Sequence, residues 1–320
     1  MKKPAKRVML LGATGTVGQA TVRALVQQNY ELVCFGRTKP DLQVDATFRD
    51  GDVTNNESIR NNGFCGEQFD VLVSCLASRS GEPKDAWAID HQAHVDALAC
   101  AVDAGVKQMV LLSAICVQKP KLQFQFAKLA FEKKLKESGI VYSIVRPTAL
   151  FKSLSGQIDR VKNGKPFMVF GNGQLTACKP ISDRDLANYM VQCIADETLH
   201  NRILPIGGPS AAITPQQQGE ELFALIGKSP RFTRVPVAML DVIIGGLSAL
   251  GLAIPACARK AELARIGRYY ATESMLVFDH EANRYDQAAT PSTGSDTLFD
   301  FYAEAIAHDK PIDRGEHAVF

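Results

Sequence analysis

The stretch from Val8 to Gly18 constrains the fold of this chain more than any other part of the sequence. It reads VMLLGATGTVG, in which a short apolar run leads into three glycines spaced G-x-x-G-x-x-G, and a helical pattern begins at once. We expect a strand, a tight turn and a helix, with Gly12 in the turn and Gly15 leaving room for a pyrophosphate. Gly18 would allow the helix to lie close to the sheet, and the phosphate would lie at the helix N-terminus. The stretch therefore predicts a nucleotide-binding βαβ unit.

Short apolar runs and helical patterns alternate as far as Pro147. We expect strands at 8–11, 31–35, about 46–49, 69–75, 108–112 and 141–146, with helices over 16–28, about 85–104 and 124–138. These six βα units predict an α/β fold with a Rossmann-type doubly wound parallel sheet and right-handed crossovers. Beyond Pro147 strands become sparse, and glycine and proline become frequent. We therefore expect a dinucleotide-binding domain over 1–150 and a smaller lobe over 151–320, mostly for substrate binding or capping, packed on the first.

The charge and cysteine content narrow the class of protein. The 320 residues carry 36 basic and 34 acidic side chains, which is no signature of nucleic-acid binding. Eight cysteines are scattered without C-x-x-C pairs, mostly in apolar segments, as is typical of a reducing cytoplasm. Residues 1–7 are basic, but only residues 8–11 form the apolar run behind them, so we expect no signal peptide and a cytoplasmic location.

The most apolar segment covers residues 237–258 and has no charge from Val242 until Arg259. This run of about seventeen residues contains three glycines and Pro255, so it is short and interrupted for a transmembrane helix. We expect no transmembrane segment here, and instead a core helix or an apolar wall of the substrate site. Shallow contact with a membrane surface stays open.

The end of the second expected strand distinguishes the two nicotinamide cofactors. NAD-preferring folds usually carry an acidic residue there for the ribose hydroxyls, whereas this chain has Arg37, followed by Lys39. A guanidinium pairs well with a 2′-phosphate and stacks on adenine, so we expect NADPH. Asp52 and Val53 fall where such folds often touch the adenine ring, and a helix N-cap is the alternative role for Asp52.

Ser113 and Lys128 carry a resemblance to the short-chain dehydrogenase/reductase superfamily. In that superfamily the catalytic serine follows the strand that we expect here at 108–112. A Tyr-x-x-x-Lys pair opens the next helix, which we expect here at 124–138. Phe124 stands at the position of the tyrosine, so the phenolic acid used on carbonyls and alcohols is missing. The resemblance implies Ser113 and Lys128 as catalytic residues, with Lys128 also holding the nicotinamide ribose. The expected cofactor-binding residues are Gly12, Thr14, Gly15, Thr16, Val17, Gly18, Arg37, Lys39, Asp52, Val53 and Lys128.

Longer blocks sharpen the resemblance and span most of the chain. They are SCLASR (74–79), LLSAICVQKP (111–120), YSIVRPTA (142–149), FKSL (151–154), ACKPIS (177–182), LPIGGP (204–209) and IGRYYA (266–271). These blocks resemble the family of divinyl chlorophyllide 8-vinyl reductases. The resemblance implies NADPH-dependent reduction of the 8-vinyl group of a divinyl chlorophyllide-type tetrapyrrole to ethyl, in chlorophyll or bacteriochlorophyll biosynthesis. Hydride addition to a vinyl group leaves a carbanion that the macrocycle delocalises, so this chemistry needs no tyrosine.

Candidate substrate contacts lie in or near the same blocks. A pigment propionate needs a cation, although each candidate cation is equally a solvated charge. The tyrosine pair either stacks on the macrocycle, supplies the proton or packs in the core. The candidate substrate residues are Phe124, Phe151, Lys152, Lys179, Arg268, Tyr269 and Tyr270. His91 and His94 have helical i, i+3 spacing, but no Cys/His cluster completes a site, so we expect no metal.

The dinucleotide-binding first part of the sequence is also compatible with other functions. NADP-binding regulators of the NmrA kind keep the dinucleotide fold, lose the tyrosine and act as sensors. An oxidoreductase for another large apolar substrate, or an assembly factor for pigment proteins, is a further alternative. The sequence also leaves open the proton donor, the hydride face, the oligomeric state, the choice between chlorophyllide and protochlorophyllide, and contact with photosynthetic membranes through 237–258.

Overall fold

The computed structural model describes residues 6–308, so most of the basic N-terminal residues lie outside the described part of the chain. The first half contains β1 (Arg7–Leu11), α1 (Thr16–Gln27), β2 (Glu31–Gly36), β3 (Thr47–Asp50), α2 (Asn56–Ser58), η1 (Ile59–Phe64), β4 (Val71–Ser74), α3 (Pro83–Ala86), η2 (Trp87–Ala93), α4 (His94–Asp103), β5 (Gln108–Leu112), η3 (Ile115–Gln118), α5 (Gln123–Glu137) and β6 (Val141–Pro147). The second half contains α6 (Phe151–Leu154), η4 (Ser155–Gln157), α7 (Ile158–Lys162), β7 (Phe167–Phe170), α8 (Asp183–Ala195), η5 (Glu197–Leu199), β8 (Arg202–Ile206), α9 (Pro215–Leu225), β9 (Phe232–Val235), α10 (Val237–Gly251), α11 (Pro255–Thr272), β10 (Val277–Asp279), β11 (Arg284–Asp286) and α12 (Leu298–His308).

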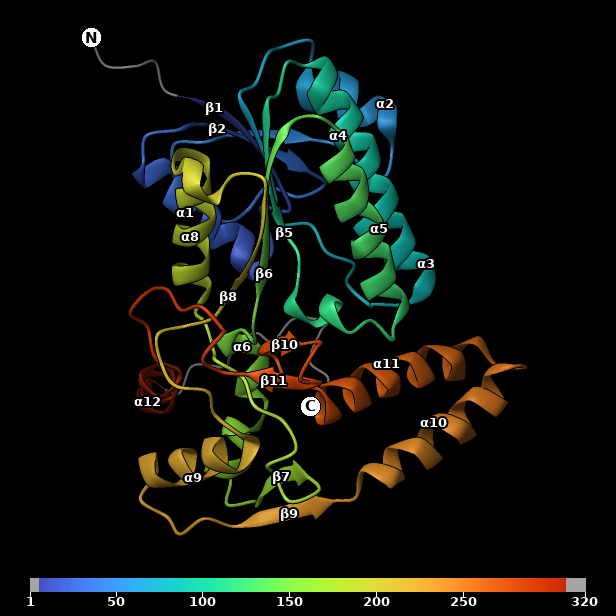
Figure 1. Cartoon of the computed structure of the whole chain (residues 1–320), viewed down its shortest axis with the longest axis vertical. Coiled ribbons are helices and arrows are strands. Elements are labelled where there is room, and N and C mark those ends of the chain that lie inside the picture. The colour runs from blue at the N-terminus through green and yellow to red at the C-terminus, as the bar shows by residue number, and fades with distance from the viewer. Residues whose placement is uncertain (1–5, 309–320) are drawn as a thin grey trace.

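A parallel sheet of seven strands organises the described residues, in the order β3-β2-β1-β4-β5-β6-β8. The order reverses after β1, as it does in a doubly wound Rossmann-type fold, which confirms the expected fold class. Helices cover both faces of the sheet (Figure 1). The inner strands read as continuous apolar runs because both of their faces are buried.

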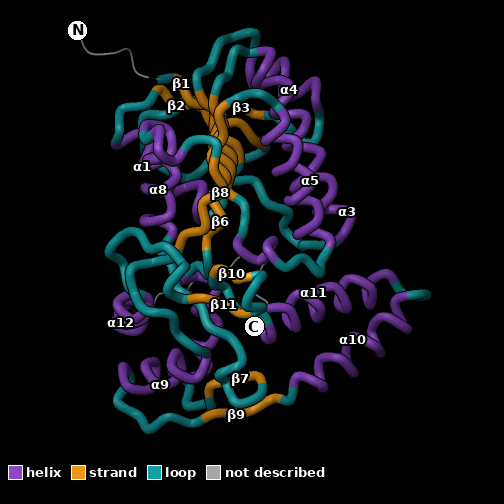
Figure 2. The backbone as a smooth tube through the Cα atoms, viewed as in Figure 1, coloured by secondary structure: helices purple, strands orange, loops and turns teal. Residues whose placement is uncertain are grey.

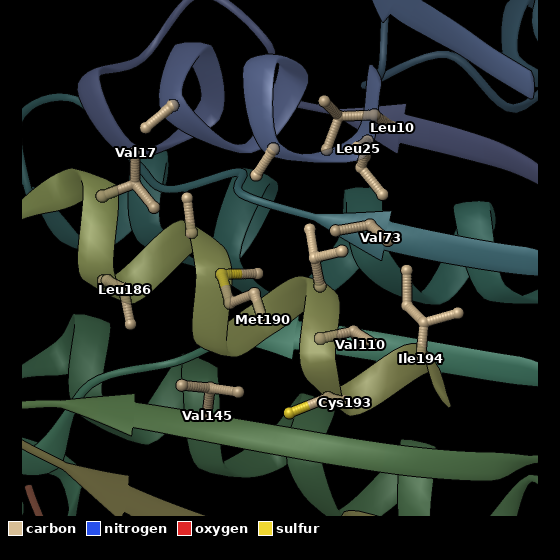
Figure 3. Packing of buried hydrophobic residues seen from close by; sticks show 14 of the residues in the cluster. Leu10, Val17, Leu25, Val73, Val110, Val145, Leu186, Met190, Cys193 and Ile194 are labelled. Atoms are coloured by element: carbon tan, nitrogen blue, oxygen red, sulfur yellow. The ribbon is translucent and has the colours of Figure 1, made fainter. Parts of the chain in front are cut away.

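The two faces of the sheet bury separate cores. On one face Val8 and Leu10 of β1 pack with residues of α1 and α8, among them Leu25 and Met190 (Figure 3). On the other face Met9 of β1 packs with buried residues of α4 and α5. The five inner strands thus contribute alternate side chains to each core, as the two-residue period of a strand requires.

The sheet contains a seventh strand, which corrects the expectation of six. β8 pairs with β6 at the edge of the sheet, and α8 lies beside α1 on the sheet face. The sequence signal was weak because β8 is half exposed and contains Pro205, a residue that strands tolerate mainly at an edge. Residues 183–206 therefore return to the first lobe. The expected division at residue 150 stays a prediction for the remainder.

The helix expected over residues 85–104 is divided. A π-helical segment, η2, separates α3 from α4. π-helical turns are rare and occur often at functional sites. This segment carries the buried carboxylate of Asp90, which the sequence did not single out.

The second lobe has a smaller core of its own. β7 pairs with β9, and α6, α7, α9 and α12 enclose a cluster that includes Phe151, Phe167, Phe223 and Tyr302. From β9 the chain runs into α10 and α11, which form a hairpin that reaches away from the body of the molecule (Figures 1 and 2). The lobe thus consists of a packed part below the sheet and a projecting arm.

The expectation of a core helix or substrate wall at residues 237–258 is wrong. None of the residues of α10 is buried, and Val242 and Leu252 are 74% and 92% exposed. The cavity described below is lined by no residue of 237–258. An apolar run shows that a segment prefers to be covered, but it does not show what covers it. None of the described helices is both long and apolar enough to cross a membrane.

Candidate functional site

A cavity of about 1260 Å³ lies along the carboxyl ends of the sheet strands. Its lining includes Gly12 after β1, Arg37 after β2, Ser113 after β5 and Thr148 after β6, together with second-half residues such as Phe167. In doubly wound sheets this edge, at the point where strand order reverses, is where ligands bind. The volume exceeds that of a common small-molecule pocket. It therefore has room for a dinucleotide and a second large ligand.

The glycine turn is shaped as the spacing predicted. Gly12 has a φ of +80°, and a Cβ there would lie 2.7 Å from the Cys75 backbone. A Cβ on Gly18 would lie 2.0 Å from the Gly12 carbonyl oxygen, so the first turn of α1 needs glycine for close packing. A Cβ on Gly15 would meet nothing closer than 3.7 Å. The space above Gly15 is thus open to a ligand, not filled by protein.

This turn fits a dinucleotide pyrophosphate. Thr14, Gly15, Thr16 and Val17 all line the cavity, and Gly15 is the N-cap of α1. No side chain caps the first turn of α1, and that turn has no acidic residue. Helix N-termini of this kind present backbone N–H groups to phosphate oxygens.

The four residues expected around the adenosine end separate into two groups. Arg37 and Val53 line the cavity, whereas Lys39 and Asp52 do not. The Asp52 carboxylate accepts hydrogen bonds from the Thr54 backbone N–H at 2.9 Å and hydroxyl at 2.8 Å. These bonds hold the pKa of Asp52 below its ordinary value. Asp52 therefore closes a turn ahead of α2, whose N-cap is Asn55.

Lys128 lines the cavity from α5 and is held by a buried carboxylate. Its Nζ lies 2.9 Å from Oδ1 of Asp90, whose side chain is fully buried, while the Lys128 side chain is 12% exposed. Asp90 also accepts hydrogen bonds from the Ser78 hydroxyl, at 2.6 Å, and the Ser78 backbone N–H. One of three ammonium donors is thus committed to Asp90, and two remain to face the cavity.

Ser113 lines the cavity, but its hydroxyl group donates its hydrogen bond to a residue outside the cavity. Its Oγ donates to Oε1 of the buried Glu132 at 2.6 Å, and Glu132 also accepts from Nε and Nη2 on one edge of the Arg146 guanidinium. Ser113 therefore offers the cavity a hydrogen-bond acceptor, not a ready proton. Its expected catalytic role stays a prediction in that narrower form.

Phe124 and the tyrosine pair lie around one end of the cavity. Phe124 is buried in a cluster with Cys116, Ile266 and Tyr269. The Tyr269 hydroxyl donates to the carbonyl oxygens of Cys116, at 2.8 Å, and Lys119, so it is a core residue outside the lining. Tyr270 lines the cavity, is 37% exposed, and places its hydroxyl 3.9 Å from the Cys116 sulfur.

The cations expected near the pigment do not converge. Lys179 donates to the Thr290 carbonyl, and Arg268 pairs with Asp241 of α10; neither lines the large cavity. Lys152 lines the cavity, but its Nζ donates to the Thr16 hydroxyl in the glycine turn at 2.9 Å. Phe151, another second-lobe candidate, also lies outside the cavity lining; it is a core residue whose ring is tilted against that of Phe301.

The His91–His94 pair is occupied by other bonds. The ring nitrogens of His94 lie 2.8 Å from the Ser74 hydroxyl and 2.8 Å from the Ile89 carbonyl oxygen. Burial lowers the pKa of His94 to about 4, so the ring is neutral near pH 7. Within residues 6–308 no group of three or more His, Cys, Asp or Glu side chains is arranged to hold a metal.

Sequence reasoning missed Asp90 and Glu132, the two carboxylates that hold Lys128 and Ser113. A faint signal was present for Asp90, because it lies four residues before the buried His94 and follows the buried Ala86 by four. A charged residue on the apolar face of a helical pattern needs a partner when buried. Which partner it has depends on contacts across 38 residues of sequence.

Comparisons with known proteins agree with this geometry. Residues 12–197, more than half of the chain, match the family model described as NAD(P)H-binding. The chloroplastic divinyl chlorophyllide a 8-vinyl-reductase of Arabidopsis thaliana is 44% identical over 93% of this chain and 76% of its own length. The photosystem II assembly factor Ycf39 of Synechocystis is 23% identical over 73% of this chain and 72% of that protein.

Solved structures bear out the fold. The NADPH-dependent quinone oxidoreductase QOR2 of Escherichia coli, complexed with NADPH, aligns with a TM-score of 0.66 at 19% identity. The alignment covers 94% of this chain and 99% of that one. With the glycine turn, the family model and the 44% identity in agreement, this chain has a nicotinamide-dinucleotide-binding fold and belongs to the divinyl chlorophyllide a 8-vinyl-reductase family.

Proposed function

We propose that this protein reduces the 8-vinyl group of divinyl chlorophyllide a, or of a related divinyl tetrapyrrole, to an ethyl group with NADPH, in chlorophyll or bacteriochlorophyll biosynthesis. The observation that carries the proposal is one cavity that joins the glycine turn, Lys128 and Phe124 to an apolar wall from the second lobe. The family relatives bear the matching name. A large planar pigment needs such an apolar wall next to the nicotinamide.

NADPH, when bound, supplies the hydride that adds to the terminal vinyl carbon. The chain's own task is to hold the reactants in register and exclude water, because proximity supplies much of the rate in such a transfer. Lys128 would donate hydrogen bonds to the nicotinamide ribose, and Asp90 fixes the position of its ammonium group. Asp90 is thus a positioning residue.

The inner vinyl carbon then takes a proton. The macrocycle delocalises its negative charge, so no oxyanion needs a phenol at position 124, and Phe124 serves as a wall. Of the tyrosine pair, Tyr270 faces the cavity and Tyr269 does not. We therefore assign to Tyr270, and not to Tyr269, the role of stacking on the pigment or supplying the proton.

The choice of NADPH over NADH rests on Arg37. Its side chain lines the cavity at the end of β2, where an acidic residue would repel a 2′-phosphate. A guanidinium there would pair with the 2′-phosphate. Lys39, outside the lining, adds only a longer-range positive charge.

A spectroscopic assay tests the proposed reaction. Purified protein is incubated with NADPH and divinyl chlorophyllide a, and separately with divinyl protochlorophyllide. We expect the Soret band to shift to shorter wavelength as the vinyl group leaves conjugation, with one ethyl product per NADPH oxidised. Gly15→Val is the control without cofactor. NADPH binding without any ethyl product from either pigment would overturn the proposal in favour of a non-catalytic sensor or assembly factor.

We propose further that the α10–α11 hairpin rests on a membrane surface from the cytoplasmic side. Met239, Ile243 and Leu250 share one exposed face of α10, and Leu252 and Ile254 extend this face to the hairpin end. Beside it, Lys260 and Arg259 are exposed on α11, and Arg259 lies 3.7 Å from Glu82, while the hairpin acids Asp241 and Glu262 are paired with arginines. An apolar face flanked by exposed basic side chains suits an anionic lipid surface.

Vesicle sedimentation tests this contact. We expect the protein to co-sediment with vesicles containing anionic lipid, and Leu252→Asp to reduce the bound fraction severalfold without changing NADPH affinity. The matched control Val102→Asp changes an exposed apolar residue on α4, away from the hairpin. Equal vesicle binding by Leu252→Asp, or a stable dimer that buries the hairpin, would contradict the membrane contact.

A further inference from the structure

Lys152 lies in α6, at the start of the second lobe, yet its ammonium group lies at the glycine turn. α6 follows β6, and Nζ of Lys152 donates to Oγ1 of Thr16 at 2.9 Å across 136 residues of sequence. We propose that Lys152 binds the pyrophosphate of the dinucleotide, as a contact that the second lobe contributes to the cofactor site. This proposal concerns cofactor binding, and it does not depend on which substrate is reduced.

The position of Thr16 carries the argument. Thr16 is the first residue of α1, directly after the N-cap Gly15, and both line the cavity. A pyrophosphate on this helix end lies over the open space at Gly15, where a Cβ would meet nothing within 3.7 Å. An ammonium group bonded to the Thr16 hydroxyl is therefore next to the phosphate oxygens. Because an ammonium has three donors, it bonds the hydroxyl and a phosphate oxygen together.

The other basic residues of the cavity serve different places. Lys128 is bonded to Asp90, and Arg37 lies at the end of β2, where the adenosine 2′-phosphate is expected. Arg79 follows β4 and is exposed. Among the described basic residues that line the cavity, Lys152 is the one with a hydrogen bond to the glycine turn. Its geometry favours a phosphate over the pigment propionate expected from the sequence.

The anchoring of α6 gives this contact a consequence for the whole molecule. Phe151, the residue before Lys152, is buried in the second-lobe core beside Phe301 of α12. A charge-assisted bond from Lys152 to the pyrophosphate thus ties the second lobe to the cofactor. Dinucleotide binding would hold the apolar wall of the second lobe against the sheet before the pigment enters.

Fluorescence titration in the absence of pigment tests the proposal. Lys152→Gln, Lys152→Arg and the control Lys133→Gln, an exposed lysine on α5, are each titrated with NADPH, NADH and 2′-AMP. We expect Lys152→Gln to weaken NADPH and NADH by the same factor, roughly 10- to 100-fold, as for the loss of one charge-assisted bond. Lys152→Arg should retain most of the affinity, and Lys133→Gln all of it. Binding of 2′-AMP, which has no pyrophosphate, should be unchanged in every variant and shows that the first lobe is folded.

Three outcomes would overturn the assignment. Unchanged NADPH and NADH affinity in Lys152→Gln would remove Lys152 from the cofactor site. A loss confined to NADPH and 2′-AMP would place it at the 2′-phosphate. Normal cofactor affinity together with a raised KM for the pigment, measured in a separate assay with pigment, would assign Lys152 to the propionate instead. Because the titrations contain no pigment, failure of the proposed reduction leaves their result intact.

Discussion

The cavity and the α10–α11 hairpin differ in which side chains they bury: charged side chains are buried around the cavity, whereas apolar side chains are exposed on the hairpin. Around the cavity, two ion pairs are largely buried: Asp90 with Lys128, and Glu132 with Arg146. On the hairpin, apolar side chains such as Leu252 stand in solvent. Buried ion pairs are costly to desolvate, and exposed apolar faces invite association, so neither arrangement is explained by stability alone. The difference supports the ligand site proposed for the cavity and the contact surface proposed for the hairpin.

The largest effects are expected from substitutions at Gly15 and Gly18, and one should impair cofactor binding while the other should impair folding. Gly18→Val should prevent folding, because even a Cβ would lie 2.0 Å from the Gly12 carbonyl oxygen. Gly15→Val should leave the melting temperature nearly unchanged but abolish measurable NADPH binding, because its side chain fills the phosphate position. Thermal melts and NADPH fluorescence titration check both. Retained NADPH affinity in a folded Gly15→Val protein would refute the phosphate site.

Lys128→Ala tests whether the buried pair serves the ligand. It should lower kcat/KM by about 100-fold through lost cofactor positioning, and lower the free energy of unfolding by about 3–5 kcal/mol because Asp90 stays buried without its partner. Adding Asp90→Asn should recover much of the stability and none of the activity. Urea unfolding and single-turnover vinyl reduction measure the two effects. The interpretation fails if Lys128→Ala leaves NADPH affinity and rate untouched.

Arg37→Asp tests the adenosine end of the cavity. The change should narrow or reverse the preference for NADPH over NADH by about 10- to 100-fold in the ratio of kcat/KM values, because a carboxylate repels the 2′-phosphate. Lys39→Asp, outside the cavity lining, is the matched control and should change the ratio far less. A wild-type cofactor ratio in Arg37→Asp would show that Arg37 does not contact the phosphate.

Phe124→Tyr should have a smaller effect. If the macrocycle stabilises the carbanion, Phe124 is only a wall, and a new phenol should change kcat by much less than tenfold. A general acid typically contributes 10²- to 10⁴-fold, so a phenol that completed the site would raise the rate by that order. Single-turnover reduction at saturating NADPH, in normal and deuterated water, reports on the proton step. A hundredfold gain would contradict the wall role.

On the hairpin, a drastic change should hardly alter stability. Leu252→Asp places a charge on a side chain that is already 92% exposed, so the free energy of unfolding should stay within about 0.5 kcal/mol of wild type. Urea denaturation without lipid is the measurement. A loss of more than about 2 kcal/mol would mean that the hairpin packs against protein and would remove the contrast with the cavity.

Local patterns in the sequence determined the dinucleotide-binding half. The glycine spacing, the apolar strands, and the positions of Arg37, Phe124 and Lys128 follow from the short-range geometry of strand, turn and helix, which a sequence states directly. The longer blocks determined the family, which the 44% identity confirms. These features need no knowledge of distant contacts.

Tertiary structure decided which groups meet. It paired Lys128 with Asp90, committed Ser113 to Glu132, brought Lys152 to Thr16, and moved Lys179 and Arg268 away from the large cavity. It also added β8 to the sheet edge and left α10 uncovered. A buried charged residue needs a partner, and an apolar residue is favoured where other residues bury it. Neither residue type specifies which segment fulfils that need. The partner is chosen by packing between segments tens of residues apart, and no local pattern records that choice.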